Sequence, residues 1–193
     1  MRLGRRGPRR QVLAGGGLLL GLMAVRGAVP PATLPAADPE IDTGDPGGWR
    51  GFTASDELLG EAARRVGDAY PGLFAHQRAG IAFLLARRRA ILADDMGLGK
   101  TRQAIIAARE AAPAGPFLVI CPAGVKLNWR REIALVEEDP DVQILNGKDA
   151  FDRGRRWTVV NYDILSRFEG LFARVKWGAV IVDEAHFIKN GSR

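Results

Sequence analysis

The chain has 193 residues, of which 47% are hydrophobic and 26% charged, values typical of one globular domain with a real core. Its formal net charge of +6 comes from residues 1–30, which carry six arginines and no acid, because the 22 basic and 22 acidic residues of the remainder cancel. Overall basicity therefore gives no argument for nucleic-acid binding. The single cysteine, Cys121, excludes an internal disulfide and a zinc site built from several cysteines.

Residues 1–27 resemble an export signal. The twin arginine formed by Arg9 and Arg10 precedes a glycine-diluted apolar stretch, a pattern that suits the Tat route. A wrongly assigned start codon is the alternative interpretation, with Met23 available as a later start. The stretch is too short and too rich in glycine to predict a membrane span.

Residues 28–48 are rich in Pro, Gly, Ala and Asp and predict a disordered linker, so the folded part is expected from 49 to 193. Two helices are expected first, one over residues 55–65 and one that follows the segment 73–78. Short apolar runs typical of buried strands come next, at residues 90–93, 117–121, 142–145 and 157–163 and in the run that ends before Asp183.

A glycine-rich loop joins the strand at 90–93 to a helix that is expected from Thr101 onward. Gly97 and Gly99 can take positive φ and let the backbone approach an anion, which the N-terminus of the helix would attract. Lys100 would reach the β- and γ-phosphates of a nucleotide, and the Thr101 hydroxyl would ligate Mg²⁺. The stretch therefore predicts a nucleotide-binding loop.

This loop departs from the general pattern G-x-x-x-x-G-K-[ST], because Asp94 stands at the first glycine position. A glycine-rich turn that happens to precede a lysine is the alternative. The strand before the loop and the helix after it favour the phosphate-binding interpretation. The residues predicted to bind the nucleotide here are Asp94, Asp95, Met96, Gly97, Leu98, Gly99, Lys100 and Thr101.

The last apolar run ends in two adjacent carboxylates, Asp183 and Glu184. Transfer of a phosphoryl group to water requires a carboxylate that holds Mg²⁺ beside the γ-phosphate and a second one that orients and deprotonates the attacking water. We expect Asp183 in the first role, together with Thr101 as a metal ligand, and Glu184 in the second, with Lys100 as the other catalytic residue.

The octet DDMGLGKT at residues 94–101 resembles motif I of the Swi/Snf (Snf-two) family of DNA-dependent ATPases, in helicase superfamily two. The segment 123–133 resembles the family's motif Ia, residues 161–163 resemble motif Ib, and residues 183–190 resemble its DEAH-x-x-K-N signature. These motifs follow one another in the family's order. Asp95, in place of the commoner Glu, and the wording of motif Ia are similar to the HepA-related and annealing-helicase branch.

The resemblance implies roles for further residues. Gln77 would read the adenine edge, although a solvated helix glutamine is the alternative. Motif II would consist of Asp183, Glu184, Ala185 and His186, with His186 linking the ATP site to later motifs. Candidate DNA contacts are Lys126, Asn128 and Asn161, whereas Trp129 is expected to pack in the core.

The implied fold is α/β, a P-loop NTPase with the parallel sheet of a RecA-like helicase lobe, truncated after the DEAH motif. The family places the strand that follows motif II between the strands of motifs I and II. Its absence before Arg193 predicts a gap at the centre of the sheet, with unpaired strand edges. The second RecA-like lobe, with its arginines, would be missing in cis, and an incomplete gene model of a larger enzyme is the expected explanation.

The expected function is that of the ATP-binding first lobe of a Swi/Snf-type double-stranded DNA translocase or remodeller, with ATP and Mg²⁺ as cofactors and double-stranded or branched DNA as partner. As this fragment, we expect nucleotide binding with little autonomous hydrolysis. The alternatives are a non-catalytic truncated ATP-binding module and an exported protein with a degenerate P-loop. The expected location is cytoplasmic and nucleoid-associated, or exported by the Tat route if the leader is genuine.

Overall fold

The computed structural model describes residues 21–25, 56–87, 89–93 and 97–185. Several sequence predictions lie outside these residues: the linker at 28–48, most of the leader, and the site residues Asp94, Asp95, Met96 and His186. Within the described ranges, no helix is both long enough and apolar enough to span a bilayer.

A six-stranded sheet forms the centre of the fold, with strand order β2-β1-β6-β3-β5-β4. Its strands are β1 (Gly21–Val25), β2 (Arg89–Leu92), β3 (Phe117–Cys121), β4 (Val142–Ile144), β5 (Trp157–Asn161) and β6 (Ala179–Val182). The strands β6, β3, β5 and β4 are parallel neighbours, and β1 is antiparallel to both β2 and β6. Five strands thus share one direction, so the carboxyl ends of β2, β6 and β3 meet at one edge of the sheet. The predicted α/β fold with a parallel sheet is confirmed.

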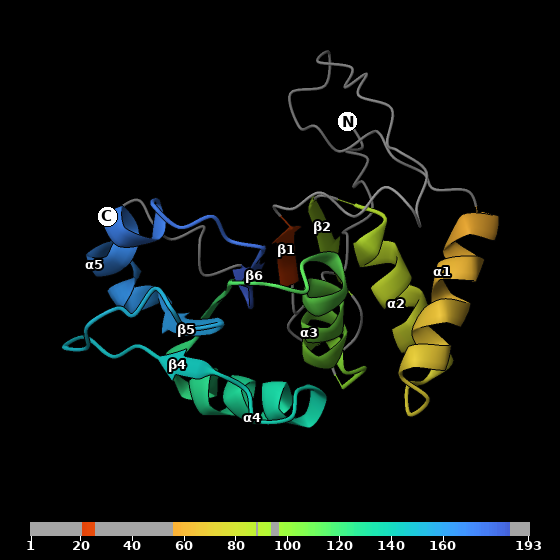
Figure 1. Ribbon diagram of the computed structural model, residues 1–193, viewed down its shortest axis with the longest axis horizontal. Coiled ribbons are helices and arrows are strands. Elements are labelled where there is room, and N and C mark those ends of the chain that lie inside the picture. Colours follow the sequence, from red (N-terminus) through yellow and green to blue (C-terminus); the bar gives the residue numbers. More distant parts are fainter. Residues whose placement is uncertain (1–20, 26–55, 88, 94–96, 186–193) are drawn as a thin grey trace, which may run out of the picture.

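Helices cover both faces of the sheet (Figure 1). They are α1 (Asp56–Ala69), α2 (Ala75–Leu85), α3 (Lys100–Ala111), α4 (Lys126–Val136) and α5 (Tyr162–Phe172), and a short 3₁₀ turn, Ala123–Val125, precedes α4. Side chains of β3 alternate between two clusters, as the period of a strand requires. Phe117 and Val119 pack with α2, α3 and α4, whereas Leu118 packs with Phe168 and Phe172 of α5.

The expected gap at the centre of the sheet is not present, and that expectation was wrong. β1, which comes from the leader, lies between β2 and β6 and pairs with both, so that Met23 stands opposite Ala90 on one side and Ile181 on the other. An extended segment of five residues satisfies backbone groups that would otherwise be unpaired. The export-signal interpretation of residues 1–27 stays a prediction.

The strand expected over residues 157–163 is shorter than predicted. β5 ends at Asn161, and α5 begins at Tyr162 with Asp163 in its first turn. A carboxylate near a helix N-terminus interacts favourably with the helix dipole. The Asn161 Nδ2 also donates to the Asp163 Oδ2 at 2.9 Å. The segment that resembles motif Ib therefore turns from strand into helix.

Candidate nucleotide site

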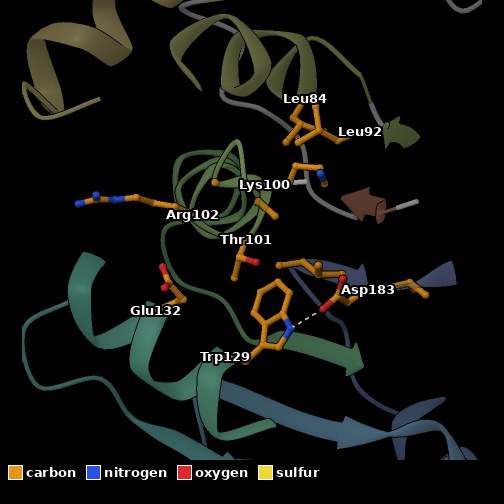
Figure 2. Close-up of a pocket in the computed structure, with 13 residues that line it drawn as sticks. Leu84, Leu92, Lys100, Thr101, Arg102, Trp129, Glu132 and Asp183 are labelled. Atoms are coloured by element: carbon orange, nitrogen blue, oxygen red, sulfur yellow. Dashed lines mark hydrogen bonds between the residues drawn. The ribbon is translucent and has the colours of Figure 1, made fainter. Parts of the chain in front are cut away.

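A pocket of about 290 Å³ opens at the carboxyl ends of β2 and β6, beside the N-terminus of α3 (Figure 2). Its lining includes residues from the predicted phosphate loop, from α4 and from the end of β6: Gly97, Gly99, Lys100, Thr101, Trp129, Glu132 and Asp183. The structure thus brings together Lys100, Thr101 and Asp183, which the sequence places more than 80 residues apart across the two motifs.

The phosphate loop has the backbone that its glycines predict. Gly97 has φ 85° and Gly99 has φ 72°, and Gly99 is the residue that caps α3 before Lys100. A Cβ at Gly99 would lie 2.3 Å from the Gln77 Nε2, so glycine is required here both for its conformation and for space. Gly99, Lys100 and Thr101 place the N-terminus of α3 in the pocket wall, and a helix N-terminus can bind an anion.

The carbonyl oxygen of Leu98 anchors this loop. The Gln103 Nε2 donates to it at 3.0 Å and the Gln77 Nε2 at 3.3 Å, and the His76 Nε2 lies 3.3 Å from it. A carbonyl offers two lone pairs, so three nitrogens compete for them. The loop is therefore held from both α2 and α3, and at most two of the three nitrogens can donate to this oxygen at the same time.

Gln77 is buried, and both ends of its amide are used. Its Oε1 accepts the backbone N–H of Phe74 at 3.1 Å, which caps α2, while its Nε2 reaches Leu98. Only 8% of Gln77 is exposed, so the solvated alternative does not describe this residue. Its predicted contact with adenine stays a prediction. The Gln77 Oε1 can accept one more hydrogen bond and the Nε2 can donate one more.

Sequence reasoning missed Gln103. It is fully buried on the face of α3 that faces α2, and a Cβ added at Gly80 would lie 1.9 Å from its Oε1. The available signal was a polar residue inside the apolar run QAIIAA, at the start of the helix that follows the loop. A buried polar side chain at such a place needs a partner. The Gln103 Nε2 has one in the loop, whereas its Oε1 accepts no hydrogen bond from the described residues.

Asp183 is fixed from three sides at the end of β6. Its N–H donates to the Ile120 carbonyl at 2.8 Å, and the Tyr162 hydroxyl donates to its carbonyl oxygen. Its side-chain Oδ2 accepts the indole N–H of Trp129 at 2.9 Å, the dashed line in Figure 2. Burial, followed by the negative charge of Asp183, raises the pKa of Tyr162, so that its hydroxyl remains a donor.

Glu184 directly follows and has φ 53°, in the left-handed region. A glutamate rarely adopts this conformation, and such outliers persist only where the surrounding structure imposes them. The backbone therefore turns sharply between the two carboxylates of motif II. Ala185 is the last described residue of that motif.

Two of the three predicted DNA contacts lie in one hydrogen-bond network away from the pocket. The Lys126 Nζ donates at 3.0 Å to each of three oxygens, the Leu145 carbonyl, the Asn146 Oδ1 and the Asn161 Oδ1. An ammonium has three protons, so a phosphate contact would require exchange of one of these bonds. Asn128 is exposed on α4. The DNA contacts stay predictions.

The donor set fits a magnesium nucleotide. The Thr101 hydroxyl and the Asp183 carboxylate line the same pocket, and hard oxygen ligands are those that Mg²⁺ prefers. Among the described residues, no group of three or more His, Cys, Asp or Glu could hold a metal ion alone. Mg²⁺ commonly completes its coordination with substrate phosphates and water, so two protein oxygens beside a phosphate loop are sufficient.

Cys121 is a buried free thiol at the end of β3, as expected for a structural cysteine. Burial raises the pKa of its thiol to about 12, and the nearby negative charge of Asp183 contributes in the same direction. The thiol therefore stays neutral next to the site and takes no part as a nucleophile at neutral pH.

A parallel sheet with a glycine loop at the start of a helix, opposite a strand that ends in an aspartate, defines a P-loop NTPase of the RecA-like helicase type. The chain belongs to the SNF2-related domain family, which matches residues 76–193. This confirms the resemblance to the Swi/Snf family.

Three curated relatives show the range of similarity. The chain is 40% identical over 123 residues to the SWI/SNF-related matrix-associated actin-dependent regulator of chromatin subfamily A-like protein 1 of Bos taurus, a match that covers 61% of this chain and 13% of the relative. It is 38% identical to the chromatin-remodeling ATPase INO80 of Arabidopsis thaliana, over 53% of this chain and 8% of the relative. It is 40% identical to the ISWI chromatin-remodeling complex ATPase ISW1 of Saccharomyces cerevisiae, over 52% of this chain and 10% of the relative. The chain thus spans a small part of each relative's length.

Proposed function

We propose that this chain is the ATP-binding first lobe of an SNF2-type, DNA-dependent ATPase. One observation carries the proposal. A phosphate loop with Lys100 and Thr101 at the start of α3 faces Asp183 across a single pocket. The names of the INO80 and ISW1 relatives, which are chromatin-remodeling ATPases, support the same activity.

Each residue of the site has a role in this proposal. The loop N–H groups and Lys100 bind the phosphates, while Thr101 and Asp183 supply oxygens to Mg²⁺, which neutralises charge on the phosphates when bound. Glu184 follows Asp183 on a sharp turn and orients the attacking water. Gln77, already beside the loop, binds the adenine edge.

Nucleotide binding by the purified 193-residue chain tests this proposal. The affinity for a fluorescent ATP analogue should collapse in Lys100→Ala and stay unchanged in Lys148→Ala, a matched control because Lys148 is an exposed lysine of a turn away from the pocket. Equal binding by both variants would contradict the proposal and favour the degenerate P-loop alternative.

We expect the 193 residues by themselves to bind ATP and to hydrolyse it slowly. In related systems, arginines supplied across the cleft are worth roughly 10³ to 10⁵ in rate. The family resemblance assigns these to a second lobe. Mixing the chain with DNA and measuring phosphate release tests this expectation, and DNA-stimulated turnover would contradict it.

Double-stranded or branched DNA is the partner we propose, in the compartment where DNA and ATP occur together. Asn128, exposed on α4, is the predicted contact best suited to a test, because its replacement breaks no contact that holds the fold. Asn128→Ala should weaken binding of a labelled duplex in a salt-dependent assay, with nucleotide affinity unchanged. Unchanged duplex binding would remove Asn128 from the interface.

A further inference from the structure

We propose that Trp129 is a positioning residue for the metal site, and that its indole N–H holds the Asp183 carboxylate in the orientation that receives Mg²⁺ with the nucleotide. This inference rests on the proposed function and deepens it. It assigns a role to the tryptophan of the segment that resembles motif Ia, for which the sequence predicted packing alone.

The geometry joins packing and polar contact in one side chain. Trp129 is 2% exposed, belongs to the main core cluster and also lines the pocket. The Nε1 lies 2.9 Å from the Asp183 Oδ2, across 54 residues of sequence. Figure 2 shows the indole directed from α4 toward Asp183, with Thr101 on the same side of the pocket.

The backbone and the side chain of Asp183 are held by different hydrogen bonds. Ile120 and Tyr162 hold its N–H and its carbonyl oxygen, which places the Cα at the end of β6. These bonds leave rotation about χ1 and χ2 free. The Trp129 bond acts on the carboxylate itself, so it selects the rotamer that projects into the pocket.

The kind of donor matters for a metal ligand. An indole N–H is neutral and only donates, so it orients a carboxylate without cancelling its charge. It occupies Oδ2 and leaves Oδ1 available. Groups that orient a ligating carboxylate in this way strengthen metal binding without touching the metal, and their loss costs about 10-fold or more in metal affinity.

A purely structural role is the competing explanation, because buried indoles usually find an acceptor. Trp157 provides the matched control. It is fully buried, and its Nε1 donates at 3.1 Å to the Glu137 carboxylate. It stands at the start of β5, at the sheet edge opposite the pocket. Trp129→Phe and Trp157→Phe therefore remove the same donor from the same kind of acceptor, but only one of them at the site.

The experiment measures the affinity of the full chain for a fluorescent ATP analogue in EDTA and in excess Mg²⁺. The expected result is that Trp129→Phe keeps the wild-type affinity in EDTA and loses about 10-fold in Mg²⁺. Trp157→Phe should unfold at a lower temperature and keep the wild-type ratio of the two affinities. An unchanged ratio in Trp129→Phe would overturn the inference while leaving the proposed function intact. Absence of nucleotide binding by the wild type in both conditions would overturn both.

A second measurement needs no Trp129 variant and covers the case in which that variant fails to fold. The chain has four tryptophans, so the indole N–H resonances of the labelled wild type form a small set that Phe variants of the other three assign. Addition of Mg²⁺ to the nucleotide-saturated protein should shift the Trp129 resonance. Asp183→Asn should abolish that shift. A Trp129 resonance that does not shift on addition of Mg²⁺ would contradict the inference.

Discussion

Two carboxylates in this molecule each accept an indole N–H from a buried tryptophan, yet their surroundings differ. At one edge of the sheet, Glu137 also pairs with two guanidinium groups, with the Arg109 Nε 3.0 Å and the Arg156 Nε 3.2 Å from its oxygens. At the other edge, Asp183 accepts its bond from Trp129 and faces a pocket that contains the phosphate loop. The first carboxylate is neutralised by the protein, whereas the neutral indole leaves the charge of the second intact.

The comparison shows how similar local contacts serve different ends. Glu137 is 8% exposed, and a charge so deeply buried requires cationic partners. It joins the end of α4 to α3 and to the start of β5. Asp183 has one orienting bond and direct access to the pocket, as a ligand for a cation requires. The following substitutions test this difference, beginning with the one expected to change stability most.

Removal of the neutralised carboxylate should have the largest effect on stability. Glu137→Ala removes the ion-pair partner of Arg109 and the hydrogen-bond acceptor of the Arg156 Nε and the Trp157 N–H, and we expect a loss of about 3 kcal/mol in the free energy of unfolding. Glu138→Ala, the adjacent exposed carboxylate, is the control and should change it little. Urea denaturation measures both. A loss under about 1 kcal/mol for Glu137→Ala would mean that the cluster is only a surface ion pair.

Replacement of the pocket carboxylate should have the opposite profile. Asp183→Asn preserves the shape and the acceptor for the indole, so we expect a change in unfolding free energy of under about 1 kcal/mol. The Mg²⁺-dependent part of nucleotide affinity should disappear, as titration with and without EDTA would show. Large destabilisation together with unchanged Mg²⁺ dependence would reverse the assignment of the two carboxylates.

The tether of the phosphate loop should affect binding more than stability. Gln103→Met keeps the approximate volume of a fully buried side chain but replaces its amide by an apolar thioether, and so removes the 3.0 Å bond to the Leu98 carbonyl. We expect near-neutral stability, because the Gln77 Nε2 still donates to the Leu98 carbonyl and the lost amide includes a buried Oε1 that accepts no hydrogen bond from the described residues. Nucleotide affinity should fall a few-fold. Gln143→Met, a matched change in β4, should leave affinity unaltered, and a drop of equal size there would contradict the tether.

The last prediction concerns pH. The Cys121 thiol has a pKa near 9.0 when free and about 12 in the folded protein, so the stability it contributes is complete below pH 9 and is lost as the pH rises from 9 toward 12. Unfolding free energy should therefore decline in this range, and less so in Cys121→Ala. Because the charge of Asp183 helps to raise this pKa, Asp183→Asn should reduce the decline slightly. Denaturation series from pH 7 to 11 measure the decline in unfolding free energy. An identical decline in all three proteins would assign it to titrating groups other than Cys121.

Local patterns made the phosphate loop and motif II predictable. The expected phosphate contacts come from residues that lie within five positions of one another, from Gly97 to Thr101. Their placement depends only on a strand, a turn and a helix that are local in the sequence. The alternation of short apolar runs with helices likewise indicated the parallel sheet. These features need no knowledge of distant contacts.

The remaining features depend on contacts between residues far apart in sequence. The bonds of Trp129 to Asp183 and of Tyr162 to the Asp183 carbonyl span 54 and 21 residues, and no periodicity encodes such pairs. The place of β1 was missed for a different reason. Its glycine-diluted apolar residues are typical of an export signal as well as of a strand, and only the two neighbouring strands distinguish the possibilities.

The position of β1 has a consequence for the order in which the molecule folds. Met23 pairs with Ile181, near opposite ends of the described chain, so this ladder closes a loop that contains almost every other element. Non-local pairing of this kind is slow, because the entropy of loop closure is lost before the contacts form. During synthesis, β1 leaves the ribosome first and must wait for β6. The sheet should therefore consolidate from β3 and β5 outward, with β1 added last and the edge strand β2 joined to the sheet through it.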